Sequence, residues 1–152
     1  MTITLSPMTR ALELAALAAE AGEVPVGAVV VDPATGEIVA EGANQPIAGH
    51  DPTAHAEMLV IRAACAALGS ERLTGADLYV TLEPCPMCAA AISFARIARL
   101  YYGASDPKSG GVEYGPRVFE HPQCHHRPEV YDSISEAASA RLLRRFFADR
   151  RD

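Results

Sequence analysis

The sequence predicts an α/β fold in which helices cover a mixed central sheet of about five strands. One observation is the alternation of β-branched apolar runs with segments of strong helix formers. A second is that 49% of the 152 residues are apolar and the mean hydropathy is +0.08, which excludes a disordered chain. This length suffices for one buried core, so we expect a single domain spanning residues 1–152.

The first half of the chain contains two predicted helices and a predicted hairpin. Gly22 and Gly69 end the two helices, because glycine is frequent directly after a helix. Thr53 is expected to cap the start of the second helix. The predicted elements are a helix over 8–21, strands over 24–32 and 37–42 joined by a turn, and a helix over 54–68.

The second half continues the alternation and includes a long irregular segment. Pro and Gly recur throughout residues 104–128, and a segment of this kind inside a domain usually carries function. The predicted elements are a strand over 77–81, a helix over 86–94, a strand over 97–102, a short strand near Val130 and a helix over 135–148.

Two predicted helices lack the polar face of a surface helix. Beyond its first turn, the helix over 54–68 has Arg62 as its only charged residue, and residues 87–95 have none. Such helices are expected to be buried on both sides, one against the sheet and the other against a second copy of the chain in a homodimer. The alternative is that the alanines of these helices tolerate exposure to solvent.

Charge and cysteine content narrow the possible partners and compartments. The chain has 13 Lys and Arg against 19 Asp and Glu, which argues against a basic coat for nucleic acid, although residues 141–152 are locally basic. Four unevenly spaced cysteines do not form a disulfide scaffold, so we expect thiols or metal ligands. The sequence lacks a membrane span and a secretory signal, and we expect a cytoplasmic protein without a membrane partner.

The chemistry concentrates in two motifs, H-x-E and P-C-x-x-C, each at the start of a predicted helix. Cys85 and Cys88 lie three residues apart, share a helix face and benefit from the helix dipole, which lowers the pKa of a thiol. With His55 they supply three ligands, and tetrahedral zinc then keeps a position for a water that it can acidify. Glu57 points elsewhere on its helix, which suits a residue that carries protons during the loss of an amine.

Other interpretations of these residues stay open from the sequence. Cys124, His125 or His126 of the long segment is able to provide a fourth ligand, which would make the zinc structural and the chain a protein-interaction module. C-x-x-C alone also fits a redox pair. A site with a position for water is favoured, because Glu57 has a role in a catalytic site and none in a closed structural one. Cys65 is excluded as a fourth ligand, since it lies about 15 Å along the helix from His55.

Both motifs resemble those of a known family. H-x-E followed by P-C-x-x-C is typical of zinc nucleobase deaminases. The chain is similar to bacterial tRNA-specific adenosine deaminases, which convert the wobble adenosine of an anticodon to inosine. The similar blocks are EVPVGAVVV (23–31), HDPTAHAEM (50–58), DLYVTLEPCPMC (77–88) and GASDPKSG (103–110).

This resemblance implies a fold, a cofactor and residue roles. The fold would be the three-layer α/β/α cytidine-deaminase-like fold, in a homodimer whose partner subunit helps to form the substrate surface. One Zn²⁺ per subunit would be bound by His55, Cys85 and Cys88. Glu57 would be the catalytic acid and base, and Asn44 would donate a hydrogen bond to the base or ribose.

Further residues are expected to contact substrate. Asp106, Lys108 and Ser109 stand where the family has its nucleic-acid loop, and a solvated turn is the alternative. Phe147 lies beside arginines on the last helix and is able to stack on a nucleotide, with packing as the alternative. Residues 112–126 depart from the family pattern. The remaining candidates for the pocket are Val26, for which core packing is the alternative, and Pro84.

The leading hypothesis is hydrolytic deamination of adenosine to inosine in a tRNA anticodon stem-loop, by zinc-activated hydroxide with Glu57 as proton shuttle. The same zinc core also serves a deaminase of a free base or nucleoside such as guanine, cytosine or cytidine. A structural-zinc interaction module is the third hypothesis. The net charge of −6 predicts few phosphate contacts for any nucleic-acid substrate.

Overall fold

The computed structural model describes residues 6–150, and its elements follow the predicted order. The N-terminal helix begins at Pro7 because the Ser6 hydroxyl accepts a hydrogen bond from the Thr9 N–H. The elements are α1 (Pro7–Glu20), β1 (Gly27–Asp32), β2 (Glu37–Ala43), α2 (Ala56–Leu68), β3 (Asp77–Leu82), α3 (Pro86–Phe94), β4 (Arg99–Ala104), the 3-10 helix η1 (Val118–Glu120), β5 (Glu129–Tyr131) and α4 (Glu136–Ala148).

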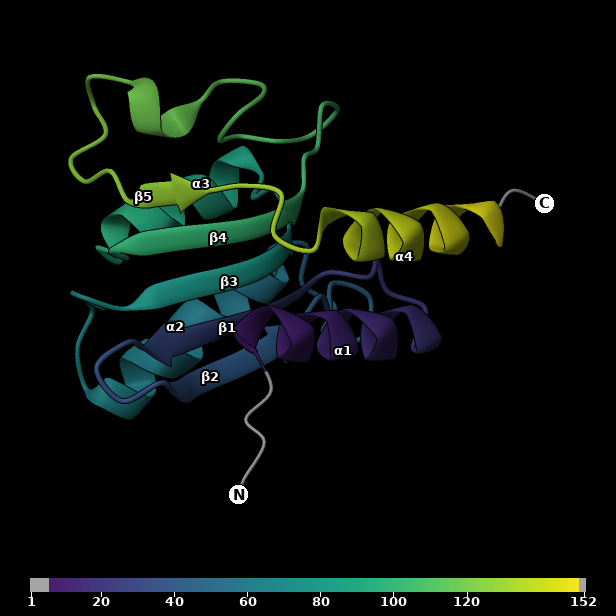
Figure 1. Ribbon diagram of the computed structural model, residues 1–152, viewed down its shortest axis with the longest axis horizontal. Coiled ribbons are helices and arrows are strands. Elements are labelled where there is room, and N and C mark those ends of the chain that lie inside the picture. The colour runs from purple at the N-terminus through teal and green to yellow at the C-terminus, as the bar shows by residue number, and fades with distance from the viewer. Residues whose placement is uncertain (1–5, 151–152) are drawn as a thin grey trace.

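The strands form one mixed sheet of five strands in the order β2-β1-β3-β4-β5 (Figure 1). β1 pairs antiparallel with both β2 and β3, whereas β3, β4 and β5 run parallel. The predicted hairpin is therefore confirmed. α3 provides the crossover between the parallel strands β3 and β4, and the long segment that contains η1 provides the one between β4 and β5.

Helices cover both faces of the sheet in three layers. α2 and α3 pack on one face, and α1 and α4 contact each other on the other face (Figure 1). α1 approaches very closely at Gly27, where a Cβ atom would overlap the Ala11 carbonyl group. The predicted α/β fold with a five-stranded mixed sheet is confirmed.

The topology brings one end of the sheet to several loops at once. Gly27 at the start of β1 pairs with Ala43 at the end of β2, and Leu82 at the end of β3 pairs with Ala104 at the end of β4. The carboxyl ends of β2, β3 and β4 therefore lie at one edge. In α/β sheets, ligands bind beyond the carboxyl ends of the strands, so this edge is where a site is expected.

The predicted start of the second helix is wrong. α2 begins at Ala56 rather than residue 54, and its N-cap is His55. The Thr53 side chain instead donates a hydrogen bond to Asp51 Oδ1, 2.7 Å away. The Asp51 carboxylate also accepts the Thr53 N–H, so both polar groups bond within a local turn. Thr53 therefore does not cap the helix.

The outer faces of α2 and α3 are apolar and uncovered in the single chain. Leu68 is 55% exposed and Phe94 is 73% exposed, and Ala63, Ala66 and Ala67 are exposed beside them. This agrees with the absence of a polar face in the sequence. No helix within residues 6–150 has the length and apolar character needed to cross a membrane.

Candidate active site

Three predicted metal ligands meet at the carboxyl edge of the sheet. The Nδ1 atom of His55 lies 3.5 Å from the Sγ atom of Cys85 and 3.5 Å from that of Cys88. All three donor atoms lie within 4.8 Å of one another. Cys88 is fully buried, and the other two residues are half-buried, so the cluster faces the protein on one side and is accessible on the other.

Two helix N-termini position this cluster. His55 is the N-cap of α2 and Cys85 is the N-cap of α3, and neither side chain caps its own helix. The side chain of Asn44 caps α2 instead, because its Oδ1 accepts a hydrogen bond from the Ala56 N–H at 2.8 Å. At α3 the first helical residue is Pro86, which has no N–H to satisfy. Both side chains are thereby free to bind a metal.

The donor set fits zinc. With zinc–sulfur bonds of about 2.3 Å and a zinc–nitrogen bond of about 2.0–2.1 Å, a tetrahedral angle separates the nitrogen and sulfur atoms by about 3.5 Å. That is the separation found between His55 and each cysteine. Among the described residues, no other His, Cys, Asp or Glu joins this group, so the chain supplies three ligands.

The residues considered as a fourth ligand are held elsewhere. Cys124 donates a hydrogen bond to the His126 carbonyl group at 3.1 Å and contacts the Ser93 hydroxyl group at 3.4 Å. The ring of His126 contacts the Ile97 carbonyl group at 2.7 Å, and His125 is exposed. The arrangement therefore does not favour a closed structural site.

The two thiols share a negative charge before metal binds. A hydrogen bond from Cys88, and then one from His55, lowers the pKa of Cys85 to about 4. The hydrogen bond to Cys85 and burial raise the pKa of Cys88. The environment therefore favours the thiolate at Cys85 over the thiolate at Cys88, and metal binding has to displace the proton of Cys88 and any proton on Nδ1 of His55.

Glu57 lies in the first turn of α2 and is buried, with 4% of its surface exposed. Burial raises its pKa to about 7. A group with a pKa near the working pH is suited both to accept and to donate a proton. Glu57 does not belong to the cluster of three donors, although its carboxyl group lies close enough to Cys88 for each to influence the pKa of the other.

The residues predicted to line the pocket differ in how they are placed. Asn44 is buried, and because its Oδ1 is used by Ala56, its amide N–H₂ is the end that can donate to a ligand. Val26 is 5% exposed and belongs to the hydrophobic core, so the structure gives it a packing role. Pro84 is buried, and its carbonyl group accepts the Gly111 N–H at 2.8 Å.

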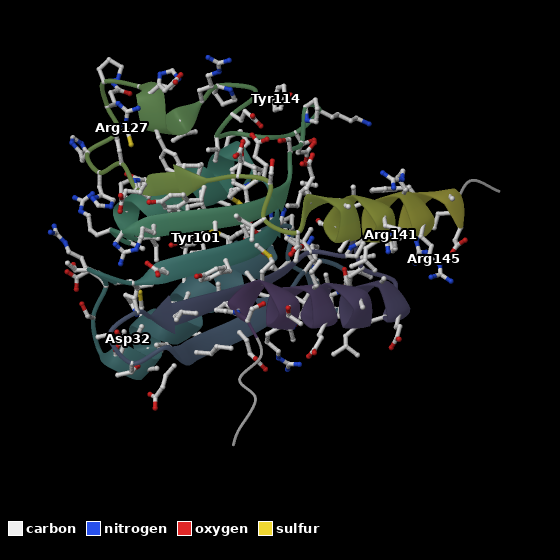
Figure 2. All side chains as sticks on the ribbon, viewed as in Figure 1. Asp32, Tyr101, Tyr114, Arg127, Arg141 and Arg145 are labelled. Carbon is white, nitrogen blue, oxygen red and sulfur yellow. The ribbon has the colours of Figure 1, made fainter. Side chains whose placement is uncertain are left out.

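The other four predicted substrate residues line one groove. Asp106, Lys108 and Ser109 face Phe147 of α4 across a groove of about 940 Å³. Phe147 is 47% exposed whereas its neighbour Phe146 is buried, so the ring of Phe147 is accessible for stacking. Arg144 and Arg150 also line this groove, and Figure 2 shows Arg141 and Arg145 on the same helix. Of the predicted basic segment, residues 151–152 lie outside the described residues.

Asn44 opens onto a smaller cavity next to this groove. The cavity, of about 290 Å³, is bordered by Asn44, Ile47 and Phe146. Val24 and Arg150 line both the cavity and the larger groove. The two depressions therefore form a continuous candidate surface along the carboxyl edge of the sheet.

Sequence reasoning missed two buried carboxylates. Glu23 is 3% exposed and accepts the N–H groups of Ile47 and Ala48, which fixes the loop after Asn44. Glu83 is 2% exposed and accepts several N–H groups of the loop after β4. Each carboxylate lies within a recognised sequence block, residues 23–31 and 77–88 respectively, but nothing in the local sequence reveals that it is buried.

The chain belongs to the cytidine and deoxycytidylate deaminase family, because residues 1–104 match the model of its zinc-binding region. This family consists of zinc-dependent hydrolytic deaminases, and the His/Cys/Cys cluster supports one Zn²⁺ in this chain. More particularly, the chain is 59% identical over 144 residues to a tRNA-specific adenosine deaminase of Agrobacterium fabrum. The match covers 95% of this chain and 93% of that protein.

Solved structures give the same picture of the fold. One, from a study of A-to-I editing by tRNA:A34 deaminases at the wobble position of transfer RNA, has a TM-score of 0.88 and 59% identity, covering 90% of this chain and 98% of that chain. Another, a guanine deaminase from Bacillus subtilis, has a TM-score of 0.65 and 34% identity, covering 99% of both chains. The fold thus serves at least two deaminase substrates.

Proposed function

We propose that this protein hydrolyses the wobble adenosine of a tRNA anticodon to inosine. The observation that carries the proposal is the pairing of a His/Cys/Cys cluster with a separate buried carboxylate, Glu57, at the ligand-binding edge of the sheet. The similarity to tRNA-specific adenosine deaminases supplies the substrate class. A tRNA substrate also implies a cytoplasmic protein.

In this proposal His55, Cys85 and Cys88 hold the zinc ion. When bound, zinc lowers the pKa of a coordinated water to about 7 and so supplies a hydroxide nucleophile at neutral pH. The reaction forms a bond from water oxygen to C6 of adenine and breaks the bond from C6 to the amino nitrogen, releasing ammonia. The protein has to move protons between these atoms.

Glu57 performs that proton transfer. It accepts a proton from water and delivers it to a ring nitrogen of the adenine. It then takes the proton of the new hydroxyl group at C6 and gives it to the leaving amine. Its burial keeps its pKa near 7, so both protonation states are available at neutral pH. Asn44 is proposed to donate from its free amide end to the base or ribose, which orients the extruded nucleotide.

The groove beside α4 is proposed to hold the anticodon strand. Phe147 offers an exposed ring on which a splayed base can stack. Lys108 and the nearby Arg144 provide positive charge for phosphate groups, and the loop from Asp106 to Ser109 supplies polar groups. Pro84 and Val26, which are buried, would support the wall of the substrate pocket from the protein interior. The acidic remainder of the chain limits the phosphate contacts to this small area.

A free purine base is the competing substrate, because a guanine deaminase shares the fold at 34% identity. The test is incubation of the purified protein with an anticodon stem-loop carrying a wobble adenosine, and in parallel with guanine, adenosine and cytidine. Inosine in the stem-loop alone is the expected result. Ammonia released only from guanine would transfer the assignment to free-base deamination.

We also propose a homodimer formed through the outer faces of α2 and α3. These faces are apolar and exposed in the single chain, with Phe94 at 73% exposure. Sedimentation equilibrium is expected to give the mass of two chains for the native protein and of one chain for Phe94→Asp. The matched control Leu17→Asp, which changes an exposed leucine on α1, should remain dimeric. A native protein with the mass of one chain contradicts the proposal.

A further inference from the structure

Glu83 is a fully enclosed carboxylate that holds a whole loop by its backbone. Its Oε1 accepts the Asp106 N–H at 3.0 Å. Its Oε2 accepts the N–H groups of Val112 at 3.1 Å, Glu113 at 2.9 Å and Tyr114 at 3.1 Å. Four backbone donors thus converge on one side chain that is 2% exposed, a set of charge-assisted bonds far stronger than those of a neutral acceptor.

The same loop is packed directly on the cysteine-bearing segment. The Gly111 N–H donates to the Pro84 carbonyl group at 2.8 Å. A Cβ atom on Gly110 would overlap the Glu83 carboxylate, and one on Gly111 would lie 2.5 Å from the Pro86 nitrogen. Both glycines are therefore required for the close approach of the loop to the segment that carries Cys85.

The loop held in this way is the one that lines the substrate groove. Asp106 Oδ1 accepts the N–H groups of Lys108 at 3.2 Å and Ser109 at 3.0 Å, and the Asp106 carbonyl group accepts the Gly110 N–H. The position of Lys108 and Ser109 thus depends on Asp106, whose own N–H is fixed by Glu83. A chain of hydrogen bonds links the residue two positions before Cys85 to the groove.

We propose that Glu83 is a positioning residue that holds the loop 106–114 in register with the metal ligands and thereby sets the affinity for RNA. It contacts neither the metal nor the substrate and acts through the loop backbone. This inference rests on the proposed function, since it assigns the loop to RNA. A carboxylate suits this place because both of its oxygens accept hydrogen bonds, and the four backbone groups bonded to it are all donors.

Glu83→Gln tests this role. The glutamine amide has a single oxygen. Placed where Oε2 lies, this oxygen keeps the hydrogen bonds from Val112, Glu113 and Tyr114. The N–H₂ group then faces the Asp106 N–H, which loses its acceptor. We expect KM for the stem-loop to rise about tenfold, with kcat within about threefold and zinc still at one per chain. Amide hydrogen exchange, measured without RNA, should become faster at residue 106 than in the wild type.

Two further variants sharpen the result. Glu83→Asp keeps the charge but shortens the reach, and its KM should lie between those of the wild type and Glu83→Gln. Glu41→Gln removes an exposed carboxylate of β2, the outermost strand on the side of the sheet away from β4, where it pairs with Arg10. This variant should leave KM, kcat and the amide exchange of the loop unchanged.

The outcomes separate this inference from the proposed function. A wild-type protein that makes no inosine overturns the function, and the RNA role of the loop with it. An active wild type together with an unchanged KM in Glu83→Gln, or with a fall in kcat and loss of zinc instead, overturns the inference alone. Unchanged amide exchange at residue 106 does so as well, whatever the kinetics.

Discussion

The His/Cys/Cys cluster and the proposed substrate groove lie at the same edge of the sheet but are built differently. The cluster takes its donors from the N-caps and first turn of two helices, and Cys88 is fully buried. The groove combines the loop after β4 with α4, and its main contacts, Lys108, Ser109 and Phe147, are exposed. Both regions join segments that are distant in sequence, but the first is compact and partly buried whereas the second is open and solvated.

This difference determines how each region responds to change. Each donor of the cluster is indispensable, because zinc has few ligands and each contributes much of the binding energy. In the proposed function, the groove would spread its binding energy for RNA over several exposed side chains, so that each contributes a modest part. Substitutions in the cluster should therefore abolish the reaction, and substitutions in the groove should only weaken binding.

Removing a ligand is expected to have the largest effect. Cys88→Ser should reduce zinc from one per chain to near zero and lower activity about 10³-fold or more, because no hydroxide is generated. Zinc is measured by elemental analysis and activity by inosine formation. The control Cys65→Ser changes a half-buried cysteine outside the cluster and should keep the zinc. Full zinc content in Cys88→Ser would contradict the ligand assignment.

The next largest effect is expected for Glu57→Gln. The amide cannot carry protons, so kcat should fall by about 10²–10⁴-fold. Zinc content should stay at one per chain, because Glu57 is outside the donor cluster. Single-turnover measurements with excess enzyme separate this loss from weaker binding. If the variant keeps its turnover, another group performs the proton transfer.

The groove should show a smaller effect. Phe147→Ala is expected to raise KM for the stem-loop between about fivefold and 100-fold with little change in kcat, since stacking contributes about 1–3 kcal/mol per base. Leu17→Ala, a similar truncation of an exposed side chain on α1, should leave KM unchanged. A fall in kcat at constant KM for Phe147→Ala would show that the groove takes part in chemistry, which would remove the contrast between the two regions.

The smallest effect lies outside both regions, at the ion pair between Glu41 and Arg10. The hydrogen bond from Arg10 lowers the pKa of Glu41 below the ordinary value of 4.5. The folded protein therefore favours the charged form, and this stabilisation is present above the unfolded pKa and lost as pH falls through the folded pKa. Glu41→Gln should lower the free energy of unfolding by less than about 1 kcal/mol at pH 7.

Urea unfolding at pH 7 and at pH 3 measures this difference. The difference in the free energy of unfolding between wild type and Glu41→Gln should become smaller at the lower pH. At pH 7 the two proteins should have equal kcat and KM. A gap that widens on acidification would mean that the carboxyl group is favoured in its protonated form in the folded protein.

The sequence alone was sufficient for the order of the elements and for the metal cluster. The hydrophobic periods predicted each helix and strand, and C-x-x-C with H-x-E identified Cys85, Cys88 and His55. The shared helix face of Cys85 and Cys88 follows from their spacing of three residues. His55 lies 30 residues before Cys85, so residue type and motif identified it, and the fold brings it to the two cysteines. The boundaries were predicted less well. β1 begins at Gly27 rather than residue 24, and β4 covers Arg99–Ala104 rather than 97–102. The start of α2 also differs, because the group that caps it belongs to Asn44, twelve residues before Ala56.

What only the tertiary structure decided is the support of the site. Burial of Glu23 and Glu83, and the convergence of backbone N–H groups on them, depend on which loops meet at the sheet edge. The groove between the loop after β4 and α4 likewise joins segments far apart in the sequence. Chemical type and local spacing are written in the sequence, whereas burial and the partners of a side chain arise only when the sheet brings its distant loops together.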